Sequence, residues 1–213
     1  HLNYFPGEAP FIRGNNAAGY RTAPNVISQI LPYFDPEEAN KELKEAISRG
    51  QTGVELHPDT ATSGYRYGTT ILDTADFLAL FQDIELCSLH INVKAGDYAP
   101  AFLNLFANEL KSRGCKPEQL HGSIPIAPLG QVLRNGFLSQ SIERMERITT
   151  DMVAFRTERL PNVKVLSVDM GTVHHSGASA VQEIAAALSM AVEYADRLTK
   201  HGLNIDDIAQ SIR

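Results

Sequence analysis

Histidine, lysine and carboxylate side chains gather where the predicted strands of this sequence end. The residues at these positions are His57, Asp59, Lys94, Asp97, Asp169, His174 and His175. Parallel strands bring their carboxyl ends to one rim of a sheet or barrel, so we expect these side chains near one another. A rim of this composition could bind a metal, transfer protons or form a covalent intermediate.

One interpretation is a metal-dependent hydrolase, because imidazole and carboxylate ligands at barrel strand ends are usual in such enzymes. The candidate ligands are His57, Asp59, His90, Asp169, His174 and His175. Their spacing matches no specific ligand motif, and His90 lies early in its strand, far from the rim. Hydrogen-bonded imidazoles explain the same residues without a metal. We therefore assign no metal ligand.

Two covalent mechanisms use the same residues. Ser176, His174 or His175, and Asp169 could be assembled into a Ser-His-Asp triad, but they lie close together in sequence and no GxSxG elbow is present. Lys94 at a strand end could form a Schiff base, although a solvated or salt-bridged lysine is more common. Neither mechanism is favoured.

The elements that position these residues alternate between strand and helix. Residues 1–34 are rich in Gly, Pro and Asn and lack an apolar period, so we expect an extended N-terminal arm. A helix begins with Asp35 as N-cap and Pro36 in its first turn, and Gly50 ends it. Four strand–helix units follow. The predicted strands cover residues 52–58, 88–94, 122–127 and 163–169, and the predicted helices cover residues 74–82, 99–113, 139–158 and 178–200.

The last predicted helix carries a wide apolar stripe, which indicates a face packed on the core. The stripe consists of Val181, Ile184, Ala185, Leu188, Ala191, Val192, Ala195 and Leu198.

Strands alternating with helices of this length predict an α/β fold with a parallel sheet. Neither GxGxxG nor GxxxxGK[ST] is present, so the nucleotide-binding reasons for an open doubly wound sheet are missing. We expect residues 35–213 to form the first half of a (β/α)₈ barrel of the TIM-barrel type, with about the first four βα units. A free half-barrel exposes strand edges, so it needs more chain or a partner.

Composition narrows the classes of partner. The 213 residues are 43% hydrophobic, and the net charge of −6 comes with acidic and basic residues interspersed. This pattern argues against a nucleic-acid partner, and no apolar run approaches the roughly 20 residues that span a membrane. There is no apolar leader. Cys87 and Cys115 sit in unrelated local settings that suggest no metal site, so we expect reduced thiols in a cytoplasmic protein.

Several motifs resemble the methylmalonyl-CoA mutase family, the acyl-CoA mutases that use adenosylcobalamin. Residues 7–14, GEAPFIRG, resemble the arm motif of the family, and the register then holds without gaps as far as Asn40. Further matching segments are residues 51–54 (QTGV), 59–65 (DTATSGY), 116–124 (KPEQLHGSI), 176–183 (SGASAVQE) and 202–206 (GLNID). The resemblance covers essentially the whole chain, and no single motif carries it.

The resemblance implies a barrel that binds acyl-CoA through its centre, with the arm alongside it. It implies a radical 1,2-shift that interconverts methylmalonyl-CoA and succinyl-CoA, driven by adenosylcobalamin. The cofactor is expected in a partner subunit or in a flavodoxin-like domain outside this chain, and not on this segment. In the register of the family, Tyr20, Gln29, Asp59 and Thr62 are the expected substrate-binding residues.

The chain departs from the family where the chemistry is expected. Active members carry Gly-Tyr-His-Met after the fourth predicted strand, where residues 170–173 here read MGTV. Residues 125–127, PIA, replace Gln-Asn-Asp, and residues 23–28, APNVIS, lack both arginines of the arm. The substrate-carboxylate arginine of the family falls on Asn135, beside Arg134.

We therefore expect the non-catalytic small subunit of such an isomerase. It would support a catalytic large subunit in a heterodimer and lack the catalytic residues itself. Two alternatives stay open. One is a catalytically competent mutase in which His174 or His175 replaces the missing histidine. The other is the metal-dependent hydrolase, built on His57, Asp59 and Asp169.

Overall fold

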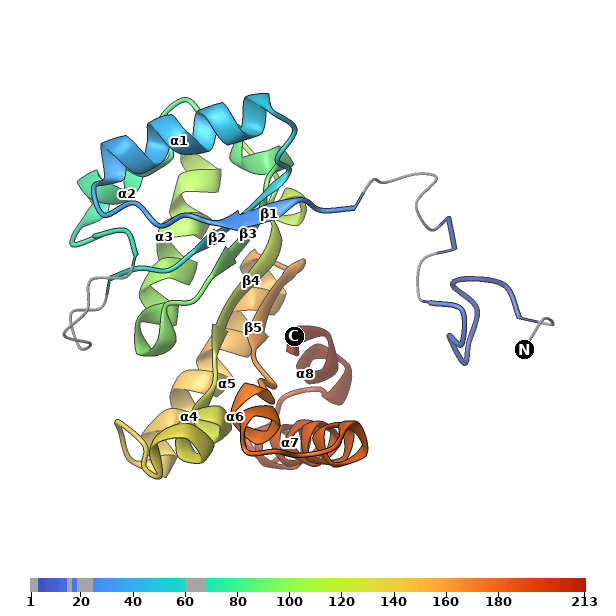
Figure 1. Ribbon diagram of the computed structural model, residues 1–213. Coiled ribbons are helices and arrows are strands. Elements are labelled where there is room, and N and C mark those ends of the chain that lie inside the picture. Colours follow the sequence, from blue (N-terminus) through green and yellow to red (C-terminus); the bar gives the residue numbers. More distant parts are fainter. Residues whose placement is uncertain (1–3, 15–16, 19–24, 60–67) are drawn as a thin grey trace.

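A computed structural model describes residues 4–14, 17–18, 25–59 and 68–213, and a parallel sheet forms its centre (Figure 1). The strands are β1 (Ser28–Ile30), β2 (Gly53–Leu56), β3 (His90–Val93), β4 (His121–Ile126) and β5 (Val163–Leu166). Their order along the sheet is the order of the sequence, and every neighbouring pair is parallel. A doubly wound sheet reverses its strand order at a switch point, whereas a barrel wall does not.

Helices cover one face of this sheet. The described helices are α1 (Pro36–Ser48), α2 (Thr74–Leu80), α3 (Ala99–Ser112), α4 (Pro128–Asn135), α5 (Ile142–Arg159), α6 (Gly171–His175), α7 (Ala180–Lys200) and α8 (Ile205–Ser211). Short 3-10 turns are η2 (Leu86–Ser88), η3 (Gly96–Tyr98) and η4 (Pro117–Gln119). The helices α1, α2, α3 and α5 lie along the same face of the sheet, and α7 and α8 lie beyond β5 (Figure 1).

Helix starts follow local sequence signals. The Asp35 carboxylate accepts hydrogen bonds from the amides of Glu37 (2.9 Å) and Glu38 (3.0 Å), which satisfies two free donors of the first turn of α1. At the start of α7, Ser179 and Gln182 form a reciprocal capping box. The start of α1 was predicted from Asp35 and the proline after it, and the structure confirms it.

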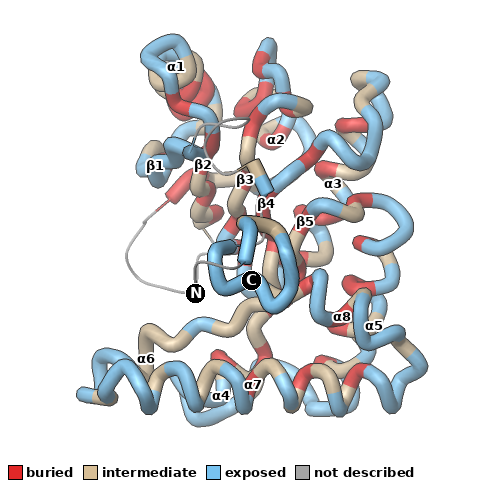
Figure 2. Tube along the Cα trace, turned by 90° about the vertical axis from the view of Figure 1, so that its right-hand side faces the viewer, coloured by how far each residue is buried: buried red, intermediate tan, exposed pale blue. Residues whose placement is uncertain are grey.

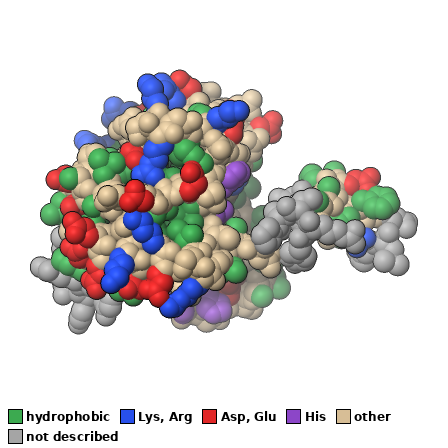
Figure 3. Space-filling model, turned by 90° about the horizontal axis from the view of Figure 1, so that it is seen from above, with side chains coloured by type: hydrophobic (Ala, Val, Ile, Leu, Met, Phe, Trp, Pro, Cys, Tyr) green, Lys and Arg blue, Asp and Glu red, His purple; other side chains and the backbone are tan. Residues whose placement is uncertain are grey.

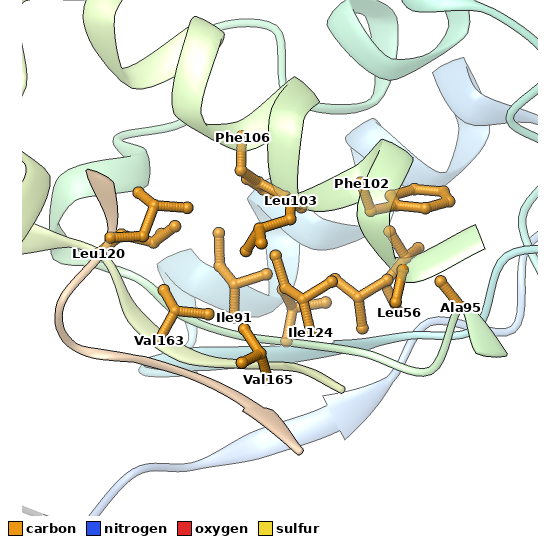
Figure 4. Close-up of a cluster of buried hydrophobic side chains, with 14 of the residues drawn as sticks. Leu56, Ile91, Ala95, Phe102, Leu103, Phe106, Leu120, Ile124, Val163 and Val165 are labelled. Atoms are coloured by element: carbon orange, nitrogen blue, oxygen red, sulfur yellow. The ribbon is translucent and has the colours of Figure 1, made fainter. Parts of the chain in front are cut away.

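The core lies between the sheet and α3 (Figure 4). Ile91, Ile124 and Val165 point from successive strands toward Leu103 and Phe106 of α3. The ring of Phe106 also packs against Phe77 of α2 and Phe81, which follows that helix. The centroids of Phe106 and Phe77 are 4.9 Å apart in an edge-to-face arrangement. This apolar face fixes which side of each strand points away from the helices.

Two buried polar side chains tie helices to neighbouring elements. The Asn40 side-chain amide of α1 donates to the carbonyl oxygens of Leu80 (2.8 Å) and Gln82 (2.9 Å) at the end of α2. Arg156 of α5 donates to the carbonyl oxygen of Val163 at 3.1 Å. Carbonyls at a helix end need such donors, so the asparagine in the EAN motif at residues 38–40 has a structural role.

The predicted α/β, barrel-type fold is confirmed, and each of the four predicted strands is present. The sheet contains one strand more. β1 lies within the predicted arm, where three residues are too few to show a period, and the amide of Leu31 donates to the carbonyl of Glu55 at 3.0 Å. The division of the chain at residue 34 stays a prediction. Helix α4 was also not expected from the sequence.

The chain begins a further parallel pairing after α8. Ile212 bridges Leu166 in parallel, and the amide of Arg213 donates to the carbonyl of Leu166 at 2.9 Å. The amide of Val168 donates in turn to the carbonyl of Arg213 at 3.1 Å. The far edge of β5, which the sequence analysis expected to be open, is therefore partly covered by residues of this chain.

Helix α7 is confirmed, but its predicted core face is wrong. Val181, Ile184 and Leu188 are 61–77% exposed, whereas Tyr194 and Leu198 are buried. Figure 2 shows long exposed stretches along α7. The buried residues of α7 lie in its second half, and the helix packs against α8, α5 and α6. Although α7 has 21 residues, none of the described helices is long and apolar enough to cross a membrane.

The expectation of two separate thiols is also wrong. Cys87 in η2 and Cys115 in the turn after α3 form a disulfide, with 6.2 Å between their Cα atoms. They lie 28 residues apart in sequence, so only the packing of α3 back along the sheet brings them together.

We predict that Gly122→Ala severely destabilises the fold. Gly122 has φ +136°, and a Cβ there would lie 1.8 Å from the carbonyl oxygen of Ile91 on the neighbouring strand. We expect a loss of about 2–4 kcal/mol in the free energy of unfolding, measured by denaturant titration.

The control is Gly136→Ala, at φ +75° with no atom within 4 Å of the added carbon. It should cost only about 1 kcal/mol, the penalty of the left-handed conformation. Equal losses in the two variants would contradict the proposed clash.

Candidate functional site

The face of the sheet opposite the helices is polar, and we call it the inner face. Strand register aligns a row of side chains across β2 to β5, consisting of Glu55, Asn92, Ser123 and Lys164. Successive residues of a strand point to opposite faces, so this row lies opposite the apolar core. His90 and His121 are paired two residues earlier on the same face. Figure 3 shows histidine side chains on the side of the body toward which the N-terminal segment extends.

Glu55 is the centre of an ionic cluster. Its Oε1 lies 2.8 Å from Lys94 Nζ and 2.8 Å from His57 Nε2. Burial on its own raises the pKa of Glu55, but hydrogen bonds from Lys94 and His57 outweigh burial and lower that pKa. Lys94 is thus held as an ion-pair partner, which is the common alternative to a Schiff-base lysine.

A chain of polar contacts connects Arg213 to residues of β4 and β3. Arg213 Nη1 donates to Ser123 Oγ at 2.6 Å, and Ser123 Oγ donates to Asn92 Oδ1 at 2.7 Å. Asn92 Nδ2 lies 3.4 Å from His90 Nδ1. Burial, and then the charges of His121 and Arg213, lower the pKa of His90. A neutral imidazole is therefore favoured at this position.

The rim beyond β5 carries two further pairs. His174 Nδ1 lies 2.7 Å from Glu183 Oε1, and Arg134 lies 3.6 Å from Asp169. Asp169 Oδ1 also accepts a hydrogen bond from the amide of Gly171 at 2.9 Å, at the start of α6. The rings of His174 and His175 meet edge to face at 5.6 Å. The polar groups at this rim are thus largely engaged within the chain.

Neither the Ser-His-Asp triad nor the rim metal site, both weighed from the sequence and not favoured, is assembled among the described residues. Ser176 Oγ donates to the carbonyl oxygen of Thr172 at 2.8 Å instead of to an imidazole. Within the described residues, the one group of three metal-ligand side chains is Glu85, Cys87 and Cys115, far from the rim. The alternative of a hydrolase built on His57, Asp59 and Asp169 therefore has no assembled ligand set in that part of the chain.

The predicted substrate-binding residues are not gathered at one place. Tyr20 and Thr62 lie outside the described residues. Gln29 pairs with Val54, which puts it on the helix-covered side, and it lines a pocket of about 410 Å³ beneath α1. Asp59 lines a different pocket, beside Tyr98, and its amide donates to the carbonyl of Thr69 at 2.9 Å. Their roles in substrate binding stay predictions.

Sequence reasoning missed the members of the inner face that do not lie at strand ends. Glu55, Asn92 and Ser123 occupy alternate positions with apolar residues between them, as in HINV of β3. This period of two was a usable signal, because a strand with two different faces alternates in this way. Which residues share a row required the strand register.

Comparison with known proteins gives consistent matches over the full sequence. A family model described as methylmalonyl-CoA mutase matches residues 1–213. The 2-hydroxyisobutanoyl-CoA mutase large subunit of Aquincola tertiaricarbonis is 26% identical over 96% of this chain, and the methylmalonyl-CoA mutase of Rhizobium meliloti (strain 1021) is 27% identical over 98%. The methylmalonyl-CoA mutase large subunit of Streptomyces virginiae is 26% identical over 98%. The chain spans 39%, 31% and 30% of the lengths of these relatives.

We predict that Glu55→Gln weakens the fold in a pH-dependent way. A carboxyl group with a lowered folded-state pKa stabilises the fold above its ordinary pKa of 4.5, and this stabilisation is lost as the pH falls through the lowered value. The variant should therefore lose about 1–2 kcal/mol at neutral pH and approach the unmodified protein in strong acid.

Urea unfolding between neutral and strongly acidic pH checks this expectation. Glu118→Gln, at an exposed carboxyl in η4, is the control and should leave the curve almost unchanged. A stability difference for Glu55→Gln that stays constant across the pH range would contradict the role of the ionised carboxylate.

Proposed function

Because the chain belongs to the methylmalonyl-CoA mutase family, we propose that it forms part of the non-catalytic small subunit of such an isomerase. It would support a catalytic large subunit that interconverts methylmalonyl-CoA and succinyl-CoA. The proposal is about the subunit role and the substrate, which the family membership by itself leaves open.

One observation carries the proposal. Residues 170–173, MGTV, stand where active members of the family carry Gly-Tyr-His-Met. In this chain they lead into α6 and form its first turn. No tyrosine or histidine occupies that turn. The next imidazole, His174, is engaged by Glu183 of the same chain. A group that grips a thioester has to be presented at near-attack distance, and residues 170–173 contain no imidazole or phenol that could do so.

The neighbouring strand end supports the same conclusion. Pro125 and Ile126 take the place of hydrogen-bonding residues, and Ile126 is buried in the core. A proline has no amide hydrogen and no polar side chain, so it cannot donate a hydrogen bond to a polar acyl group. Acyl-CoA binding by this segment would therefore depend on other residues.

Adenosylcobalamin supplies the radical chemistry in this family. At the described rim, Asp169 is paired with Arg134 and with the amide of Gly171, and His174 is paired with Glu183, which supports placing the cofactor elsewhere. We assign the cofactor to the partner subunit or to a domain outside residues 1–213.

A second candidate is a catalytically competent mutase that uses His174 or His175. Two observations favour it: relatives in the comparison are named as large subunits, and both imidazoles are exposed at the rim with their rings in contact. The two candidates predict different turnover after the imidazoles of His174 and His175 are removed.

To test the proposal, the full-length protein is purified from its host with an affinity tag. Its assembly with other subunits and its turnover of methylmalonyl-CoA are then measured. We predict a stoichiometric complex with a second mutase subunit. Turnover of methylmalonyl-CoA by this complex should change by less than about twofold in His174→Ala and His175→Ala.

A loss of about 100-fold or more in either variant, with the complex intact, would instead establish the competent enzyme. A full-length protein that is monodisperse and active without any partner would overturn the proposal altogether. Ser176→Ala is the matched control, because its hydroxyl donates to the carbonyl oxygen of Thr172 in the preceding helix.

A further inference from the structure

Glu85, Cys87 and Cys115 form a compact cluster at the amino end of the sheet. One ligand atom from each, a carboxylate oxygen and two sulfurs, lies within 4.8 Å of the other two. Cys87 and Glu85 belong to the turn that leads into β3, and Cys115 belongs to the turn that leads toward β4. The site is therefore at the opposite end of the strands from the rim that carries α6.

The backbone holds these three side chains in place. The amide of Cys115 donates to the carbonyl of Leu110 at 2.9 Å, which fixes the turn after α3. The carboxylate of Glu85 accepts a hydrogen bond from the amide of Cys87 at 3.3 Å, so it is turned toward the cysteines. Both cysteines are half-buried against the apolar core, while Glu85 is exposed. One side of the cluster thus faces solvent.

We propose that the Glu85–Cys87–Cys115 cluster, when its cysteines are reduced, is a binding site for a zinc-class divalent cation. Two thiolates and a carboxylate are ligands that zinc accepts, and water from the exposed side completes four-coordination. Cα atoms 6.2 Å apart allow both sulfurs to reach one ion after small rotations about their side-chain bonds.

The disulfide and the cation are alternative occupants of one site. A dithiol reductant breaks the Cys87–Cys115 bond, giving two electrons and two protons to form two thiols, while the reductant itself becomes a disulfide. The cation then displaces the two thiol protons to solvent and binds the two thiolates. In both states the turn before β3 stays joined to the turn before β4.

At this location the site would stabilise the fold and would not take part in catalysis. The strands that follow the two turns pair with each other from their first residues, His90 with His121. A link between the turns thus holds the amino ends of β3 and β4 in register. The inference does not depend on the proposed subunit role, since no residue of the cluster lies on the inner face or at the rim.

The test titrates the full-length protein with Co²⁺ and then Zn²⁺ alone, after reduction and anaerobic removal of the reductant. We expect one equivalent of Co²⁺ per chain with a thiolate-to-cobalt charge-transfer band, which Zn²⁺ then removes. The unreduced protein should show no such band.

Cys87→Ser and Cys115→Ser should each weaken binding by about 100-fold, and Glu85→Gln by about 10-fold or more. Glu118→Gln, at an exposed carboxyl three residues after Cys115, is a control that should bind like the unmodified protein. Circular dichroism of each variant shows whether it is folded.

Reduced unmodified protein that takes up no cation overturns the proposal without reference to any variant. Binding that survives both serine substitutions overturns it as well, because the ion would then lie elsewhere.

Discussion

The parallel pairing of β2 to β5, with one register shift between β4 and β5, is the constraint on which the rest of this structure depends. Because side chains alternate along a strand, the register sorts residues into an apolar face under the helices and a polar inner face. A slip of one residue would exchange Ile91 for Asn92 in the core. Gly122 permits the closest approach of β3 and β4, since a side chain there would meet the backbone of its neighbour.

Many side chains of the inner face that results are paired with one another. Glu55 is paired with Lys94 and His57, and His90, whose pKa is lowered mainly by burial, lies at the end of a chain of hydrogen bonds. Such pairing stabilises ionised groups in a half-buried place, but it also leaves few groups available to a reacting molecule. This pairing is one reason for the supporting role that we propose.

The same pairing explains why distant cysteines meet. Neighbouring parallel strands run in the same direction, so their amino ends lie at the same edge of the sheet. The turns before β3 and β4 therefore lie side by side there. A disulfide or a bound cation at this point would reinforce a pairing that the strands already make. The chain therefore separates a structural link at one end of the strands from its polar rim at the other.

The sequence by itself determined the local elements: the start of α1 at Asp35, the four long strands, and helix α7. These depend on capping side chains and on apolar periods, which act over a few residues. It also determined the family, through motifs spread along the chain. Only the tertiary structure decided that β1 joins the sheet, that the stripe of α7 at Val181 to Leu188 is exposed, and that Cys87 meets Cys115. These outcomes depend on contacts between residues far apart in sequence, and such contacts leave no periodic signal in either segment alone.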